Sequence, residues 1–273
     1  MKHLLWPLFA LALVPGAFAQ NFRAIRLMTA DDVGIAAAYY PVPGEHAPAL
    51  LLVHGFTQSR DGWNTLAPVL QRNGIAVLTI DLRGHGQSNR RITARGPELV
   101  DFHNLAARDF PAMLLDINAA MEWLLEQPGI DHKHIGLIGA DIGANLALRY
   151  AMVNDEIAAL VLFSPGINYR GVRTDDAMKK IGPVPLRIVV SQLENFSFES
   201  AKRLVEIRKD EGHADGQELI VCTGNLFGME LVKGVKELPG RLIPWLRQVL
   251  LGETPEPDAP ATPTPPAPKP PAR

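Results

Sequence analysis

Short apolar runs alternate with amphipathic stretches along the middle of the chain. Residues 49–53 are continuously apolar, which is typical of a strand buried on both faces, whereas 106–126 repeats apolar residues at helical spacing. The other expected elements follow this alternation, with strands at 75–80, 134–138, 158–163, 186–190 and 218–221 and helices at 63–71, 143–152, 198–208 and 229–249. The pattern predicts an α/β fold, a mostly parallel central sheet with helices on both faces.

Two further features refine this picture. Residues 22–28 and 35–40 are extended segments on either side of Asp31 and Asp32, which predicts an opening hairpin. The segment between residues 163 and 186 has only about twenty residues, too few for a substantial lid domain. Because ligands of such sheets bind at the carboxyl ends of the strands, we expect the functional residues there.

The first nineteen residues differ in composition from the body. Lys2 precedes an apolar run at 4–14, and Ala17-Phe18-Ala19 has the small-x-small pattern of a signal-peptidase site. A membrane anchor is the alternative, but the run would extend only about 16 Å as a helix, against about 30 Å of hydrocarbon. We therefore predict a signal peptide at 1–19 and an exported protein, either periplasmic or secreted, with no stable membrane span after cleavage.

The other end is rich in proline. Residues 253–273 contain nine prolines with little apolar bulk, which predicts a disordered, extended tail. Residues 20–252 then form one domain. With a formal charge of −2 and 47% apolar residues, the composition argues against collagen, general disorder and a nucleic-acid partner. The single cysteine, Cys222, excludes an intrachain disulfide, and no spacing suggests a metal site, a phosphate loop or a cofactor.

Three glycine-containing motifs coincide with predicted strand ends. They are His54-Gly55-Phe56, the segment Asp81-Leu82-Arg83-Gly84-His85-Gly86-Gln87-Ser88, and Gly139-Ala140-Asp141-Ile142-Gly143. In this order and spacing they resemble the α/β-hydrolase superfamily, especially its small serine esterases and its lysophospholipase-like and dienelactone-hydrolase-like branches. The resemblance spans about residues 22 to 250. It also implies that Asp81 and Arg83 pair within their loop.

The third motif corresponds to the strand-to-helix elbow of that superfamily, G-x-S-x-G. Gly139 and Gly143 are present, but Asp141 replaces the nucleophilic serine. Members that act on alkyl halides or epoxides also place aspartate there. The resemblance further implies an oxyanion hole formed by the backbone amides of Phe56 and Ile142. We hypothesise that the Asp141 carboxylate itself fills this hole and so suppresses the binding of acyl substrates.

The resemblance also places the other two members of the catalytic triad. Glu194, after the strand that ends near Val190, takes the acid position, and Phe227, in the turn after the last strand, takes the histidine position. Phenylalanine cannot carry a proton. The sequence therefore predicts a degenerate triad and a catalytically inactive protein that binds a small molecule or a protein partner. The alternative is an active hydrolase in which Asp141 attacks an ester, epoxide or haloalkane and another loop, such as that of His103, supplies the base.

Overall fold

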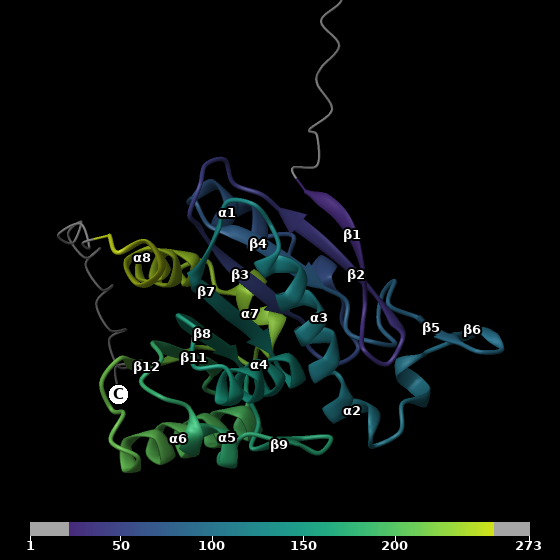
Figure 1. Cartoon of the computed structure of the whole chain (residues 1–273). Coiled ribbons are helices and arrows are strands. Elements are labelled where there is room, and N and C mark those ends of the chain that lie inside the picture. Colours follow the sequence, from purple (N-terminus) through teal and green to yellow (C-terminus); the bar gives the residue numbers. More distant parts are fainter. Residues whose placement is uncertain (1–21, 254–273) are drawn as a thin grey trace, which may run out of the picture.

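A ten-stranded sheet forms the centre of the computed structural model, which describes residues 22–253 (Figure 1). Its strand order is β12-β11-β8-β7-β3-β4-β2-β5-β6, with β1 paired to β2. The strands of this sheet are β1 Arg23–Met28, β2 Val33–Tyr40, β3 Ala47–Val53, β4 Ala76–Ile80, β5 Arg90–Thr93, β6 Gly96–Leu99, β7 Ile130–Ala140, β8 Ala159–Phe163, β11 Leu186–Ser191 and β12 Gln217–Cys222. The predicted signal peptide and all but Glu253 of the predicted proline-rich tail lie outside the described residues.

The α-helices are α1 Ala67–Arg72, α2 Asp109–Ala112, α3 Leu114–Leu125, α4 Ile142–Val153, α5 Asp175–Lys180, α6 Asn195–Asp210, α7 Met229–Gly234 and α8 Leu238–Leu251. Apolar residues of α3 to α6 join the core on one face of the sheet, and those of α1, α7 and α8 join the core on the other. The predicted α/β class, with helices on both faces, is confirmed.

The parallel part of the sheet explains the continuous apolar runs. Strand β3 lies between β4 and β7, parallel to both. Leu51 contributes to the core on one face and Leu52 to the core on the other, and both are fully buried. Because successive side chains of a strand point to opposite faces, a strand covered on both sides must be apolar at every position.

Two of the predicted helices are interrupted. The expected helix at 106–126 begins only at Asp109, and Met113 separates α2 from α3. The expected helix at 229–249 divides into α7 and α8, with Pro239 in the first turn of α8. Proline is common in the first turn of a helix, and apolar residues continue on both sides of this boundary, so their periodicity did not reveal it.

Two hairpins were not expected from the sequence. The β5–β6 hairpin extends one edge of the sheet and projects from the molecule (Figure 1). The second hairpin, β9 Asn168–Tyr169 and β10 Val172–Arg173, lies with α5 between β8 and β11. These elements are the only ones within residues 164–185, so the expected absence of a substantial lid is confirmed. Within residues 22–253, no helix has the length and apolar character needed to cross a bilayer.

Candidate active site

Asp141 occupies a strained turn between β7 and α4. Its backbone has φ 55° and ψ −123°, a conformation that residues other than glycine rarely adopt. A Cβ on Gly139 would overlap the backbone of Gly143, and one on Gly143 would lie 2.5 Å from the carbonyl oxygen of His54. Both glycines are therefore required for the turn to pack. The turn presents Asp141 at the carboxyl end of β7, where a ligand site of this fold is expected.

The Asp141 carboxylate is nearly buried, with 8% of the residue exposed. Its Oδ2 accepts a hydrogen bond of 2.9 Å from the amide of Phe56. Burial raises the pKa of Asp141 to about 6, although the backbone amides of Phe56 and Ile142 favour the ionised form. The Asp141 carboxylate therefore contacts the Phe56 amide, as hypothesised. The role of that amide as an oxyanion donor stays a prediction.

Arg170, in the β9–β10 turn, places a positive charge near the Asp141 carboxylate. Arg170 and Gly171 both have positive φ, 49° and 88°, as a two-residue type I′ hairpin turn requires. The guanidinium carbon of Arg170 lies 4.0 Å from the ring centroid of Phe56 and 5.1 Å from that of Phe110. The positive charge of Arg170 lowers the pKa of Asp141 and so opposes the effect of burial. Sequence reasoning missed Arg170, although Asn168-Tyr169-Arg170-Gly171 carries a turn signal.

Tyr169, the neighbour of Arg170 in the hairpin, is the second residue that the sequence did not single out. Its hydroxyl lies 3.1 Å from the Ser197 hydroxyl and donates to the Ser164 carbonyl at 3.2 Å. Burial, followed by the charges of Asp141 and Glu194, raises the pKa of the Tyr169 hydroxyl well above its usual range. Tyr169 is therefore a neutral hydrogen-bonding group beside the two carboxylates.

Glu194, at the predicted acid position, caps the start of α6 just after β11. Its Oε2 accepts a hydrogen bond of 2.8 Å from the amide of Ser197. Its charge also adds to the upward shift of the Asp141 pKa, behind the larger effect of burial. The two carboxylates therefore share one electrostatic environment at the carboxyl edge of the sheet.

Phe227, at the predicted base position, precedes α7 in a loop that reaches the elbow. The amide of the next residue, Gly228, donates to the Ser164 hydroxyl at 2.9 Å, and a Cβ on Gly228 would lie 3.7 Å from Cβ of Asp141. The Phe227 ring contacts Tyr169 edge to face at 6.3 Å between centroids. The loop therefore lies beside the elbow, while the assignment of Phe227 to the histidine position stays a prediction.

The histidines near this edge of the sheet have other partners. His54 is fully buried, its Nε2 accepts from the amide of Leu82, and burial lowers its pKa to about 3. His85 accepts from the amide of Thr57. His103 is exposed and lies against Phe102, with 4.0 Å between the ring centroids. No hydrogen bond in the described part of the chain joins a histidine to Asp141, so the structure does not place His103 as its base.

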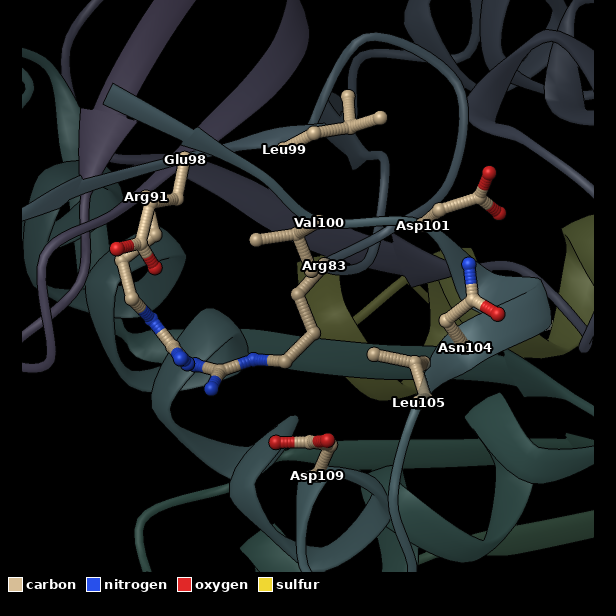
Figure 2. A pocket seen from close by; sticks show the side chains of 9 residues that line it. All are labelled: Arg83, Arg91, Glu98, Leu99, Val100, Asp101, Asn104, Leu105 and Asp109. Atoms are coloured by element: carbon tan, nitrogen blue, oxygen red, sulfur yellow. The ribbon is translucent and has the colours of Figure 1, made fainter. Parts of the chain in front are cut away.

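Arg83 belongs to a separate buried network. Its guanidinium donates to both Asp116 and Asp31, while Asp81 instead pairs with Arg60. The expected pair between Asp81 and Arg83 is therefore wrong, because Arg83 extends toward α3 rather than back along its own loop. Arg83 also lines the cavity of Figure 2, whose walls come from the β5–β6 region and the segment up to Asp109 and include no residue of the elbow.

The fold and the elbow together define an α/β-hydrolase architecture. A family model described as alpha/beta hydrolase fold matches residues 48–210, and the chain belongs to this family.

Individual relatives agree with this assignment. The chain is 25% identical over 170 residues to Thiohydrolase aneE of Aspergillus aculeatus, covering 59% of this chain and 48% of the relative. It is 35% identical over 127 residues to the fluoroacetate dehalogenase of a Burkholderia species, covering 46% and 36%. The chain thus spans half or less of the length of these curated relatives. Among solved structures, the Pyrococcus furiosus esterase Pf2001 is similar in fold, with a TM-score of 0.67 at 18% identity over 84% of this chain and 90% of the esterase.

These findings correct one prediction from the sequence. The curated relatives are named as a thiohydrolase and a dehalogenase, which points to an enzyme and contradicts the expected catalytically inactive protein. The replacement of a serine and a histidine does not by itself imply the loss of turnover. The environment of the replacement also matters, and Asp141 is a nearly buried carboxylate with a raised pKa on a strained turn.

Proposed function

We propose that this chain is a hydrolase in which the Asp141 carboxylate attacks an electrophilic alkyl carbon. The observation that carries the proposal is the hydrogen bond from the Phe56 amide to Oδ2 of Asp141. This bond holds Oδ2, and we assign the attack to the other oxygen, Oδ1. The strained elbow fixes the carboxylate in that position before a substrate arrives.

The occupied amide favours alkyl substrates over acyl substrates. A serine esterase needs its oxyanion donors free to receive the carbonyl oxygen of the substrate. Here Oδ2 of Asp141 already uses the Phe56 amide. An alkyl halide or an epoxide has no carbonyl oxygen that must bind to these donors. The similarity to a fluoroacetate dehalogenase supports alkyl substrates.

The reaction has two steps. First, Oδ1 of Asp141 forms a bond to the alkyl carbon, and the bond from that carbon to the leaving group breaks, so that a halide departs with the electron pair. Water then attacks Cγ of the resulting ester, and negative charge develops on Oδ2, where the Phe56 amide donates. Collapse of this intermediate breaks the bond between Cγ and Oδ1, and the departing alkoxide takes the proton that the base received from water to give the alcohol. The carboxylate is restored with one oxygen from water, and the second proton of that water is released to solvent.

Glu194 accepts the proton of the attacking water in this proposal. It is the carboxylate whose charge acts on Asp141, and the family resemblance assigns the histidine position to Phe227. A carboxylate is a weaker base than an imidazole. Hydrolysis of the ester is therefore the slow step, and the alkylated enzyme accumulates during turnover.

A single-turnover experiment in H₂¹⁸O with excess enzyme and a short bromoalkane tests the mechanism. We expect one ¹⁸O atom in the peptide that contains Asp141, detected by mass spectrometry, and ¹⁶O in the product alcohol. Glu194→Gln should trap the alkylated peptide. Label that enters only the alcohol would show direct attack of water on the substrate and would refute the covalent mechanism.

Export is a separate proposal that rests on the segment at residues 1–19 alone. Expression of the full chain in a bacterial host, followed by fractionation, should yield a product that begins at Gln20 outside the cytoplasm. A cytoplasmic product that retains Met1 would contradict it.

A further inference from the structure

We propose that Arg170 binds a carboxylate group of the substrate, so that the enzyme selects small alkyl electrophiles that carry one negative charge. This inference rests on the function proposed above, because it assigns the substrate class of the same site. It concerns the β9–β10 hairpin, a segment outside the three motifs that identified the family (Figure 1).

Within residues 22–253 the guanidinium of Arg170 forms no ion pair or hydrogen bond, and its charge acts on Asp141 only through space. None of the ion pairs among the described residues includes Arg170, whereas Arg83, Arg149 and Arg173 pair with Asp116, Asp176 and Asp175. Arg170 is exposed, and its guanidinium carbon lies over the Phe56 ring. A guanidinium presents its N–H donors in a fork geometry that matches a carboxylate.

Phe56 connects this cation to the nucleophile. Its amide donates to Oδ2 of Asp141, and its ring carries the Arg170 guanidinium at 4.0 Å. One residue therefore contacts both the attacking carboxylate and the Arg170 guanidinium. A substrate whose carboxylate and electrophilic carbon are close together can contact both groups at once, and this coupling favours small organic acids.

The negative charges near the site determine how Arg170 acts on a substrate. Asp141 and Glu194 place two carboxylates at this edge of the sheet, and their charges would repel an anionic substrate. Arg170 offsets that repulsion for a monoanion. A dianion such as a phosphate monoester would add a second charge without a partner, so we assign the site to a single carboxylate.

Paired substrates test this assignment. We would measure bromide release from 2-bromopropionate and from its uncharged analogue 2-bromopropionamide with the wild-type protein, Arg170→Gln and Arg170→Lys. Arg170→Gln should reduce kcat/KM for the acid about 10- to 100-fold, mainly through KM, and change that for the amide less than about threefold. Arg170→Lys should recover part of the loss. Arg173→Gln removes a charge from the same hairpin and should leave both substrates unaffected.

A binding measurement separates this inference from the proposed mechanism. Asp141→Asn cannot be alkylated, and calorimetry should show that it binds 2-bromopropionate at least tenfold tighter than the amide. Adding Arg170→Gln should remove that preference. This result without any turnover in the wild type would refute the nucleophile and retain the anion site.

Other outcomes would overturn the anion site. Turnover through Asp141 with equal kcat/KM for acid and amide would leave the mechanism intact and refute the role of Arg170. An equal loss on both substrates in Arg170→Gln, with unchanged thermal unfolding, would show that Arg170 only positions Phe56. Equal binding of acid and amide by Asp141→Asn would also refute the inference.

Discussion

Asp116 and Asp141 are two buried aspartates that differ in their partners. Burial raises the pKa of each to about 6. Asp116, in α3, accepts hydrogen bonds from the backbone amide and the guanidinium of Arg83, which opposes the effect of burial with a full charge. Asp141 is opposed chiefly by backbone amides, and its contact with Arg170 is electrostatic without a hydrogen bond. A similar pKa can therefore accompany a carboxylate that is paired with a full positive charge and one that is held by backbone amides.

The largest difference between the two should appear in activity. Asp141→Asn should reduce the rate of bromide release by at least about 10³-fold, because an amide oxygen does not displace a halide at a useful rate. In the wild type, the rate of alkylation should rise as the pH increases through about 6, since the ionised form is the nucleophile. Asp176→Asn, a surface substitution on α5, serves as the control and should retain activity. Unchanged kinetics in Asp141→Asn would eliminate this residue as the nucleophile.

Asp116→Asn should act on stability instead. The substitution weakens a buried ion pair and leaves the Arg83 charge with only Asp31, which should lower the free energy of unfolding by about 3 kcal/mol. Urea denaturation monitored by circular dichroism measures this loss. Catalysis by the folded fraction should remain near wild type. A change below about 0.5 kcal/mol would show that Asp31 alone satisfies Arg83.

Asp141→Asn should also stabilise the fold at neutral pH. The native pKa of about 6 lies above the ordinary value of 3.8, so the native state binds a proton more tightly than the unfolded chain. Wild-type stability therefore falls as the pH rises from about 4 to about 6, by at most about 3 kcal/mol. The asparagine variant lacks this loss. Urea midpoints of the two proteins should separate above pH 6 and converge below pH 4; parallel curves over the whole range would contradict the pKa shift.

Phe227→His should produce the smallest of these effects. An imidazole on this loop would assist the hydrolysis of the alkylated Asp141, and we expect the steady-state level of the ester to fall and kcat to rise about 10- to 100-fold. Phe22→His, the same change on a half-buried ring that packs against Tyr40 away from the elbow, is the matched control. Equal ester levels in both variants would show that the loop does not place a base near Cγ of Asp141.

Local sequence predicted most of the sheet and the elbow, but it did not predict the hairpins or the ion pairs. The strands β3, β4 and β7 were visible because burial on both faces imposes continuous apolar runs. The β9–β10 hairpin has only two residues in each strand, too few for any periodicity to show. The predicted partner of Arg83 was wrong. Its true partner depends on how closely α3 approaches the loop after β4, which the local sequence pattern does not encode.

The sequence by itself determined the α/β class and the strained turn at Asp141, because apolar spacing and the pair Gly139 and Gly143 act over a few residues. Only the tertiary structure decided that Phe56 would donate to Asp141 and carry Arg170 on its ring. Phe56, Asp141 and Arg170 are widely separated along the chain, and hydrogen bonds and charge interactions depend on distance in space. The chemistry of the site therefore follows from how β3, β7 and the β9–β10 hairpin assemble.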